Sequence, residues 1–416
     1  MRRAMSLLAA ILFVIILADL EAQSNVSNKL TMENAEKNGI ENNPELQYLL
    51  KNIDANKAIK IQSGLISNPE LGLEAENILG SGELSGFNGS EITATLSQNF
   101  QLAGKISKRE KVAEIDISLA EWDYYAKRLE VITEIRKAFT SALATQKLIE
   151  KNSELIEISE KLITNLQKRV EAGKISPAEV SRAQIILNSL QIGISRLEAD
   201  YDSAIFELTA LINDPNLSIG KLTGEMKNFE QLPDYDFLYS KLESNPNLKR
   251  FTSEYNKQKA VIDLEESKSI PDLTVSVGYR RITEVKINTF LVGASIPLPI
   301  FDANQGSIEE AQIRLDQKNK EYEAVKNRLT LRLNLLYRRF GMLLSISEKI
   351  ENESIPDAEE SFKIISKGNL LGRFTILDVL DAERTLFEVQ NQHINTLSEI
   401  NLVIVEIEGL TEYNIQ

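Results

Sequence analysis

The chain has 416 residues, of which 43% are hydrophobic and 26% charged, and it carries a formal net charge of −14 with no cysteine. This balance argues against a nucleic-acid partner, because phosphate binding needs a basic stripe and no run of Lys and Arg forms one. The lack of cysteine excludes disulfides and a lipid attached through an N-terminal cysteine, whereas an acidic surface is compatible with attracting cations.

Residues 1–22 have the pattern of a secretion signal. Two arginines precede an apolar stretch from Leu7 to Ala18, and a cleavage-type sequence ends at Ala22. Such a stretch, about 12 residues long, is typical of the apolar core of a signal and too short for a spanning helix. We expect cleavage after Ala22, with an uncleaved anchor as the alternative. No later apolar run reaches the roughly 18 residues of a transmembrane helix.

The sequence contains an internal duplication. Asn43-Pro44 recurs as Asn245-Pro246, and residues 176–184 line up with residues 375–383. A repeat about 200 residues long is a duplicated structural unit and not the period of a solenoid. We therefore expect one elongated body made of two pseudo-equivalent halves.

The two halves are expected at residues 23–212 and 246–416. The segment 213–245 is rich in Pro and Gly breaks and is expected to connect them. Gly173 aligns with Gly368, which gives the second half about four extra residues at that turn.

Each half begins with helical sequence, over about 31–66 and 246–269, and then changes period. Within about 70–101 and 272–298, apolar and polar residues alternate, which predicts pairs of strands with one apolar face. At about 8 to 11 residues, each strand has the length that crosses a bilayer when tilted, although a sheet half buried on a soluble domain is the alternative. The alternating apolar residues are Leu71, Leu73 and Ala75; Ile92, Ala94 and Leu96; Leu273, Val275, Val277 and Tyr279; and Phe290, Val292, Ala294 and Ile296.

Long helices are expected after each strand pair, at about 105–212 and 304–410. The stretch from Lys105 to Ala172 contains neither Pro nor Gly, and as one helix it would be about 100 Å long. Its apolar residues, like those after Val180, recur at spacings of three and four, the pattern of left-handed coiled coils. We expect two antiparallel coiled-coil hairpins, one in each half.

One chain supplies too few strands for a closed sheet. Four strands leave open edges, which cost several kcal/mol for each unpaired backbone group in lipid, and the smallest outer-membrane barrels have about eight strands. Three chains would give about 12 strands and 12 long helices around one lumen. The expected fold class is therefore mostly α with a membrane β-barrel that two or more chains close together.

Several linked motifs resemble the TolC-type outer membrane factors, and within them the CzcC-like branch of heavy-metal efflux systems. Many members of that branch are lipoproteins, a pattern from which this cysteine-free chain departs. The motifs are Asn68-Pro69-Glu70-Leu71, Glu74-Ala75-Glu76-Asn77, Gly80-Ser81-Gly82, Leu96-Ser97-Gln98, Gly104-Lys105, Ser295 to Asp302, Asn304-Gln305-Gly306 and Thr375 to Ala382.

The resemblance implies the outer membrane channel of a tripartite efflux system, a passive trimeric conduit for heavy-metal cations. In this model a 12-stranded barrel in the outer membrane continues into a periplasmic α-helical tunnel. Its implied partners are a periplasmic adaptor protein and an inner-membrane pump of the RND type. A channel for drug efflux or type I protein secretion is the alternative, because it would share this architecture. A structural periplasmic coiled-coil protein would explain the heptads but not the four strands.

Acidic residues at the start of the last long helix are the candidates for an entrance constriction. Asp378 and Asp381 share one helix face, and the resemblance implies that three copies form two acidic rings, which favour cations. The alternative is that these acids complement the helix dipole. The first half has Glu179 and Arg182 at the equivalent places, and we expect Arg182 to pair with an acidic partner in a closed state.

The hairpin tips are the candidate surface for docking the adaptor, because exposed apolar groups at a hairpin end mark contact surfaces. Helix capping is the alternative role of Gly173 and Gly368. The candidate residues are Gly173, Ile175, Ser176, Gly368, Leu370, Leu371, Gly372 and Thr375.

No enzyme, metal centre or cofactor site is expected. His393 is the only histidine, and without cysteine it cannot complete a zinc site or a nucleophilic triad, so we expect a surface or seam residue. Gly80-Ser81-Gly82 lies between strands and opens no helix, which excludes a phosphate-binding loop.

Overall fold

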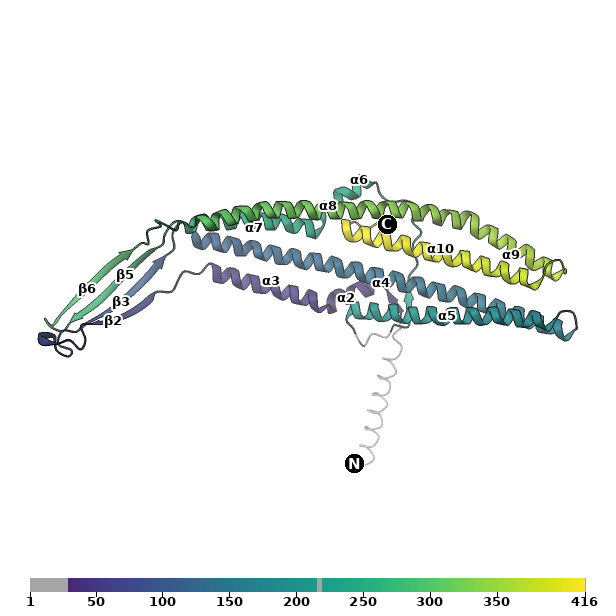
Figure 1. The fold of residues 1–416 in the computed structure, drawn as a ribbon, viewed down its shortest axis with the longest axis horizontal. Coiled ribbons are helices and arrows are strands. Elements are labelled where there is room, and N and C mark those ends of the chain that lie inside the picture. The colour runs from purple at the N-terminus through teal and green to yellow at the C-terminus, as the bar shows by residue number, and fades with distance from the viewer. Residues whose placement is uncertain (1–28, 215–218, 416) are drawn as a thin grey trace, which may run out of the picture.

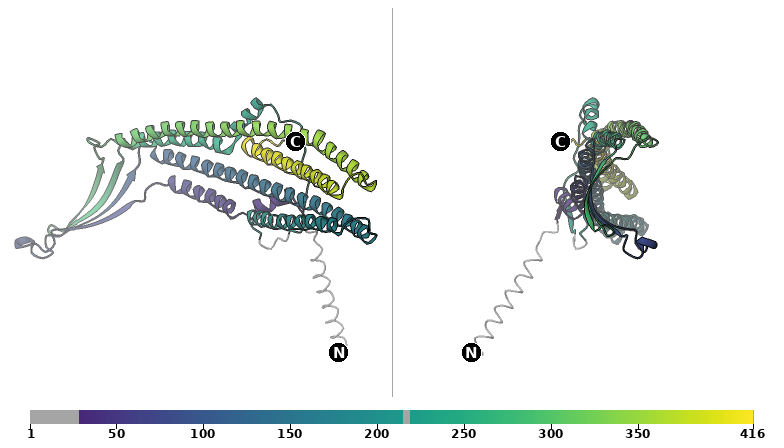
Figure 2. Two further views of the ribbon diagram at one scale, coloured as in Figure 1. Left: turned by 45° about the vertical axis from the view of Figure 1, so that its right-hand side comes forward. Right: turned by 90° about the vertical axis from the view of Figure 1, so that its left-hand side faces the viewer.

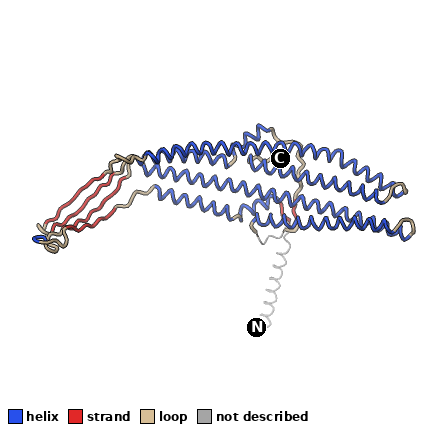
Figure 3. The backbone as a smooth tube through the Cα atoms, viewed as in Figure 1, coloured by secondary structure: helices blue, strands red, loops and turns tan. Residues whose placement is uncertain are grey.

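A computed structural model of the protein describes residues 29–214 and 219–415, and the expected signal at 1–22 lies outside them. A four-stranded sheet lies at one end, two helical hairpins end at the other, and helices run the distance between them (Figure 1). Most of the remaining described residues are helical (Figure 3). No described helix combines the length and the hydropathy of a membrane-spanning segment.

The first half carries two short helices, a strand pair and two long helices. The break between the short helices is made by Asn43, whose Oδ1 accepts hydrogen bonds from the backbone N–H groups of Glu45 and Leu46, while Pro44 takes the first helical position. The elements are β1 (Lys29–Thr31), α2 (Met32–Asn42), α3 (Pro44–Ser63), β2 (Glu70–Glu76), β3 (Glu91–Phe100), α4 (Lys105–Glu171) and α5 (Pro177–Ile212).

The second half repeats this order after a connecting segment with two short elements. One long helix of this half is interrupted, because a π turn at Ile350–Ser354 separates α8 from α9 just before Pro356, which has no N–H to donate. The elements are β4 (Lys221–Thr223), α6 (Tyr235–Lys241), α7 (Pro246–Lys268), β5 (Leu273–Ile282), β6 (Ile287–Ser295), α8 (Gln305–Lys349), α9 (Ile355–Leu370) and α10 (Ile376–Thr411).

The four long strands form one antiparallel sheet in the order β2-β3-β5-β6, so the central pair joins the two halves of the chain. The sheet is curved (Figure 2). Leu71, Leu96, Val277 and Val292 lie in one cross-strand row, and all four are exposed. Because side chains alternate between the faces of a strand, this row belongs to an apolar face and the intervening residues to a polar one.

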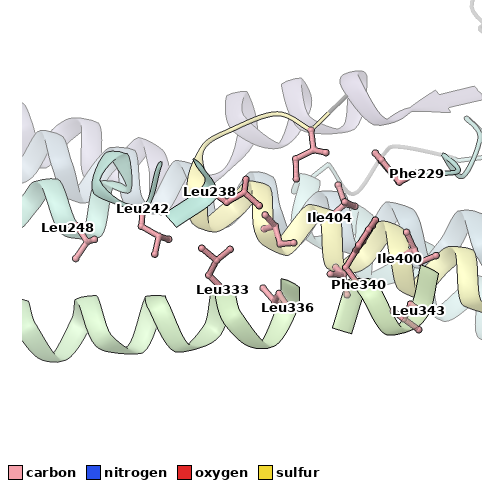
Figure 4. Close-up of a cluster of buried hydrophobic side chains, with 13 residues drawn as sticks. Phe229, Leu238, Leu242, Leu248, Leu333, Leu336, Phe340, Leu343, Ile400 and Ile404 are labelled. Atoms are coloured by element: carbon pink, nitrogen blue, oxygen red, sulfur yellow. The ribbon is translucent and has the colours of Figure 1, made fainter. Parts of the chain in front are cut away.

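Three buried clusters hold the helices together. One packs α8 and α10 against α6 and the start of α7 (Figure 4), and a second packs α2 and α3 against α4 and α5. The third, here called the tip core, joins the two hairpins near their turns. It consists of Ile163, Leu166, Ala183, Leu187, Ile376, Val379 and Leu380.

Arg136 on α4 links both halves electrostatically. Its Nε lies 2.6 Å from Glu36 Oε1 on α2, and its Nη1 lies 2.8 Å from Glu408 Oε2 on α10. The other oxygen of Glu408 accepts the backbone N–H of Ile415 at 2.7 Å. Removing one member of such a partly buried network leaves an uncompensated charge, so loss of any of these side chains would destabilise the middle of the molecule.

The two hairpin turns have equal length, which corrects one sequence alignment. Gly173 and Gly372, both left-handed, occupy the same place three residues before the caps Ser176 and Thr375. The expected match of Gly173 with Gly368, and the extra residues it implied, are wrong. Gly368 is helical and buried, and a Cβ there would lie 2.3 Å from the ring of Phe374, so close packing and not capping requires this glycine.

Candidate functional site

The two hairpin turns lie side by side at the end of the molecule farthest from the sheet (Figures 1 and 2). A cavity of about 320 Å³ lies between the turns, and its lining includes five of the residues expected at the entrance or the tips. Its lining is Leu166, Arg169, Ile175, Ser176, Glu179, Asn369, Gly372, Phe374, Thr375 and Ile376.

Three residues that sequence reasoning missed connect the turns. Arg169 at the end of α4 reaches the side chain of Asn369 at the end of α9, with Nη1 3.4 Å from Oδ1. Asn369 in turn donates from Nδ2 to the carbonyl oxygen of Phe374 at 2.9 Å. Arg169 and Asn369 each lie about one turn before a left-handed glycine, and this spacing was the only signal in the sequence.

Asp378 caps its own helix. Its Oδ2 accepts the backbone N–H and the hydroxyl of Thr375, both at 2.7 Å, while its own N–H donates to Thr375 Oγ1. This is a capping box with Asp in the acidic position. The hydroxyl and then the backbone N–H of Thr375 lower the pKa of Asp378, so the carboxylate is ionised at neutral pH.

The other entrance residues also have local partners. Asp381 is exposed and lies 2.9 Å from Arg384 Nη2, one turn along α10. Arg182 lies 3.7 Å from Glu179 on α5. Among the described ion pairs, Arg182 therefore has its partner on its own helix and not on the second hairpin.

The tips expose apolar groups. Leu371 is 70% exposed, and Phe374 and Leu377 are about two-fifths exposed. Ile175 is half-buried against the tip core. The second turn is thus the more apolar of the two.

Glu383 is a buried acid that the sequence did not reveal. It is 2% exposed, its Oε1 has no hydrogen-bond partner among the described residues, and burial raises the pKa of its carboxyl to about 7. Asn152 and Asn391 exchange side-chain hydrogen bonds between α4 and α10, and this register places Ser159, also buried and unpartnered in the described structure, at the level of Glu383. A carboxyl with a raised pKa therefore lies in the seam between the hairpins, next to the tip core.

No group of three or more His, Cys, Asp or Glu side chains in the described ranges is arranged to hold a metal ion. His393 lies half-buried on α10.

A curved antiparallel sheet carried on two long helical hairpins is the protomer architecture of TolC-like outer membrane channels. VceC from Vibrio cholerae has this fold, with a TM-score of 0.73 at 18% identity over 92% of this chain and 97% of that one.

The chain belongs to the outer membrane efflux protein family, whose model matches residues 37–214 and 237–401. It is 30% identical to the cobalt-zinc-cadmium resistance protein CzcC of Cupriavidus metallidurans, over 89% of this chain and 87% of that protein. It is 24% identical to the nickel-cobalt-cadmium resistance protein NccC of Alcaligenes xylosoxydans xylosoxydans, over 68% of this chain and 65% of that protein.

The resemblance to the TolC-type factors and their CzcC-like branch is thereby confirmed. The protein is an outer membrane efflux channel component, a conduit and not an enzyme, with its helical part in the periplasm. Family membership implies a periplasmic adaptor and an inner-membrane pump as partners.

The buried carboxyl makes stability depend on pH. Because the pKa of Glu383 is raised from 4.5 to about 7, the contribution of its carboxyl to the free energy of unfolding is fully present below pH 4.5 and is lost as the pH rises through 7. Glu383→Gln should remove this loss, which is on the order of 2 kcal/mol, and so raise the unfolding temperature at pH 8 more than at pH 5. Thermal unfolding followed by circular dichroism across this range measures the effect.

Glu388→Gln is the matched control, since Glu388 is exposed and lies on the same helix. If Glu388→Gln changed the unfolding temperature at pH 5 and at pH 8 as much as Glu383→Gln does, the pH dependence could not be assigned to Glu383.

Proposed function

We propose that three copies of this chain assemble into a conduit for heavy-metal cations, with 12 strands closed into a barrel in the outer membrane and 12 long helices around a periplasmic tunnel. The proposal rests on the two long sides of the protomer. Each side carries a strand edge without a partner in the described chain and an exposed apolar stripe on a long helix.

The strand edges support closure. β2 and β6 are the outer strands of the sheet, and each has one edge without a partner in the described chain. Every neighbouring pair is antiparallel, so β2 and β6 run in opposite directions. β6 of one copy therefore fits β2 of the next as another antiparallel pair, and three sheets of four strands close without an edge left in lipid.

The helical edges support the same contact. On α5, which lies on the same side of the protomer as β2, Ile185, Ile192 and Phe206 recur at multiples of seven and are 65%, 57% and 79% exposed. On α8, which lies on the side of β6, the exposed apolar residues are Ile313, Leu331, Leu335, Met342 and Ile346. Two such stripes can pack as the seam of a coiled coil between copies.

Heavy-metal cations are the substrate class that the relatives favour. CzcC and NccC are resistance proteins for cobalt, zinc, cadmium and nickel by name. The net charge of −14 suits a path for cations. The pump that loads such a conduit is proposed to be of the RND type.

The hairpin tips are proposed to receive the periplasmic adaptor. The exposed Leu371, Phe374 and Leu377 and the cavity between the turns offer an apolar surface with polar groups at its margin. The other residues of this candidate surface are Gly173, Ile175, Ser176, Leu370, Gly372 and Thr375. Gly368 is buried and contributes by packing against Phe374 behind the surface.

Asp378 and Asp381, with Glu179 and Arg182 beside them on the first hairpin, are proposed to form the narrow entrance. Three copies bring six Asp carboxylates to one opening, where they favour cations. The capping box fixes Asp378 at the start of α10, so one carboxylate serves both as cap and as part of the ring.

Assembly should depend on the apolar stripe. Ile192→Glu introduces a charge into the proposed contact between copies and should reduce the trimeric fraction in detergent at least tenfold, because an unpaired buried charge costs several kcal/mol. Native mass spectrometry gives the stoichiometry, and planar-bilayer recording gives the conductance. Gln191→Glu, at the neighbouring exposed position, should remain trimeric. A monomeric wild-type protein without conductance would refute the proposed conduit.

The entrance rings predict a change in conductance. The double variant Asp378→Ala, Asp381→Ala should raise single-channel conductance or leak, since six carboxylates are removed from the opening. Thr375→Ala is the control, because it weakens the helix cap but keeps both carboxylates. Unchanged conductance in the double variant, or an equal change in the control, would count against the gate.

The substrate class is tested in cells. Deletion of this protein should increase sensitivity to cobalt, zinc or cadmium salts, and expression of the wild-type chain should restore resistance. Unaltered metal sensitivity together with loss of a secreted protein or of drug resistance would indicate one of the other channel functions.

A further inference from the structure

Arg280 lies in the polar face of the sheet and is the only basic residue there. The residues of this face alternate with those of the apolar face, and the register aligns Arg280 with Thr93 on β3 and Thr289 on β6. Glu74 on β2 pairs with Thr93 and belongs to the same row. The next row of this face contains Glu76 and Glu91, and Glu70 begins the face on β2.

The Arg280 side chain contacts the neighbouring strand β3 and, beyond it, the last residue of β2. Nε donates to Thr93 Oγ1 at 2.9 Å, and Nη1 donates to Glu91 Oε2 at 3.1 Å. Nη2 lies 3.3 Å from Glu76 Oε2. Thr93 is buried, whereas the side chains of Arg280, Glu91 and Glu76 retain 28%, 24% and 44% of their exposure. One guanidinium thus partly neutralises carboxylates that still face solvent.

This cluster lies at the outer end of the sheet. Glu76 is the last residue of β2, Glu91 is the first of β3, and Ile282, two residues after Arg280, is the last of β5. The helices join the opposite end of the sheet (Figure 1). With the helices in the periplasm, the cluster faces the exterior end of the conduit.

We propose that Arg280 sets the ion selectivity at the outer end of the pore, an inference that rests on the proposed trimeric channel. In each chain this single guanidinium is accompanied by three carboxylates, those of Glu74, Glu76 and Glu91. Three copies therefore make a ring whose net charge is negative but partly compensated by the arginines. Charged rings in a pore determine which ions pass, and residues that face a barrel lumen tune selectivity. The guanidinium limits how strongly the ring holds divalent cations on their way out.

The neighbouring residue supplies a matched control. Arg281 has the same charge but belongs to the opposite, apolar face, where it lies across from Ile92 and Asn288, and its Nη1 donates to Asn288 at 3.0 Å. In the proposed barrel Arg281 lies outside the lumen. Substituting each of these adjacent arginines in turn therefore distinguishes the effect of a charge in the pore from the effect of a charge on the outer surface.

The test is the reversal potential of reconstituted channels in a salt gradient. Arg280→Gln should raise the permeability ratio of cations to anions about twofold or more at 0.1 M salt, with a smaller effect at 1 M because charges are screened. Arg280→Lys keeps the charge but loses the fork to Thr93 and Glu91, so it should retain the wild-type ratio. Arg281→Gln should also leave the ratio unchanged.

The outcomes separate this inference from the channel itself. Wild-type protein that forms no conducting oligomer refutes the proposed function, whereas a conducting wild type whose ratio is the same after Arg280→Gln refutes only the role of Arg280. A shift in Arg280→Lys equal to that in Arg280→Gln would assign Arg280 a purely structural role. If Arg280→Gln does not assemble, Glu91→Gln tests the same balance, and its ratio should fall below that of the wild type.

Discussion

Backbone hydrogen bonding at the outer strands is the constraint on which the rest of this structure depends. A strand in lipid needs partners on both edges, and the described chain satisfies only the inner edges of its sheet. Because the strands are even in number and antiparallel, the two open edges are complementary. The same two sides of the protomer carry the exposed apolar stripes of α5 and α8, so in the proposed trimer the sheet and the helices of one copy face the same neighbouring copy.

The duplication explains how one chain provides both sides. The central strand pair β3–β5 joins the halves at the sheet end, the tip core joins them at the far end, and Arg136 joins them between. Side chains at the two turns have nevertheless diverged. The first turn has Glu179 and Arg182 paired on one helix, whereas the second has a capping acid and an exposed Leu371. Equal backbones therefore present different chemistry at the tips.

Much of the fold could be predicted from sequence because its signals are local. Alternation at Leu71, Leu73 and Ala75 and the absence of Pro and Gly after Lys105 indicated strand and helix directly, and the family fold is confirmed. The features that were missed depend on contacts between distant segments. Glu383 is buried because α10 packs on α4, and the matching of Gly173 with Gly372 became clear only from their left-handed backbone. The role of Asp378 as a cap, considered as an alternative from sequence, depends on its hydrogen bonds to Thr375.

The π turn between α8 and α9 changes the phase of the second hairpin. Buried residues on α8 follow the spacing of three and four up to Ser347 and Ile350. Beyond the turn the inward positions are Ala358, Phe362 and Ile365, each one residue later than the same spacing would place it. A single inserted residue in a continuous α-helix would rotate everything after it by about 100°. The wider π turn accommodates that extra residue, so the helix after it still faces α10. The second hairpin therefore keeps its apolar side buried although it contains one residue more than the spacing of three and four requires.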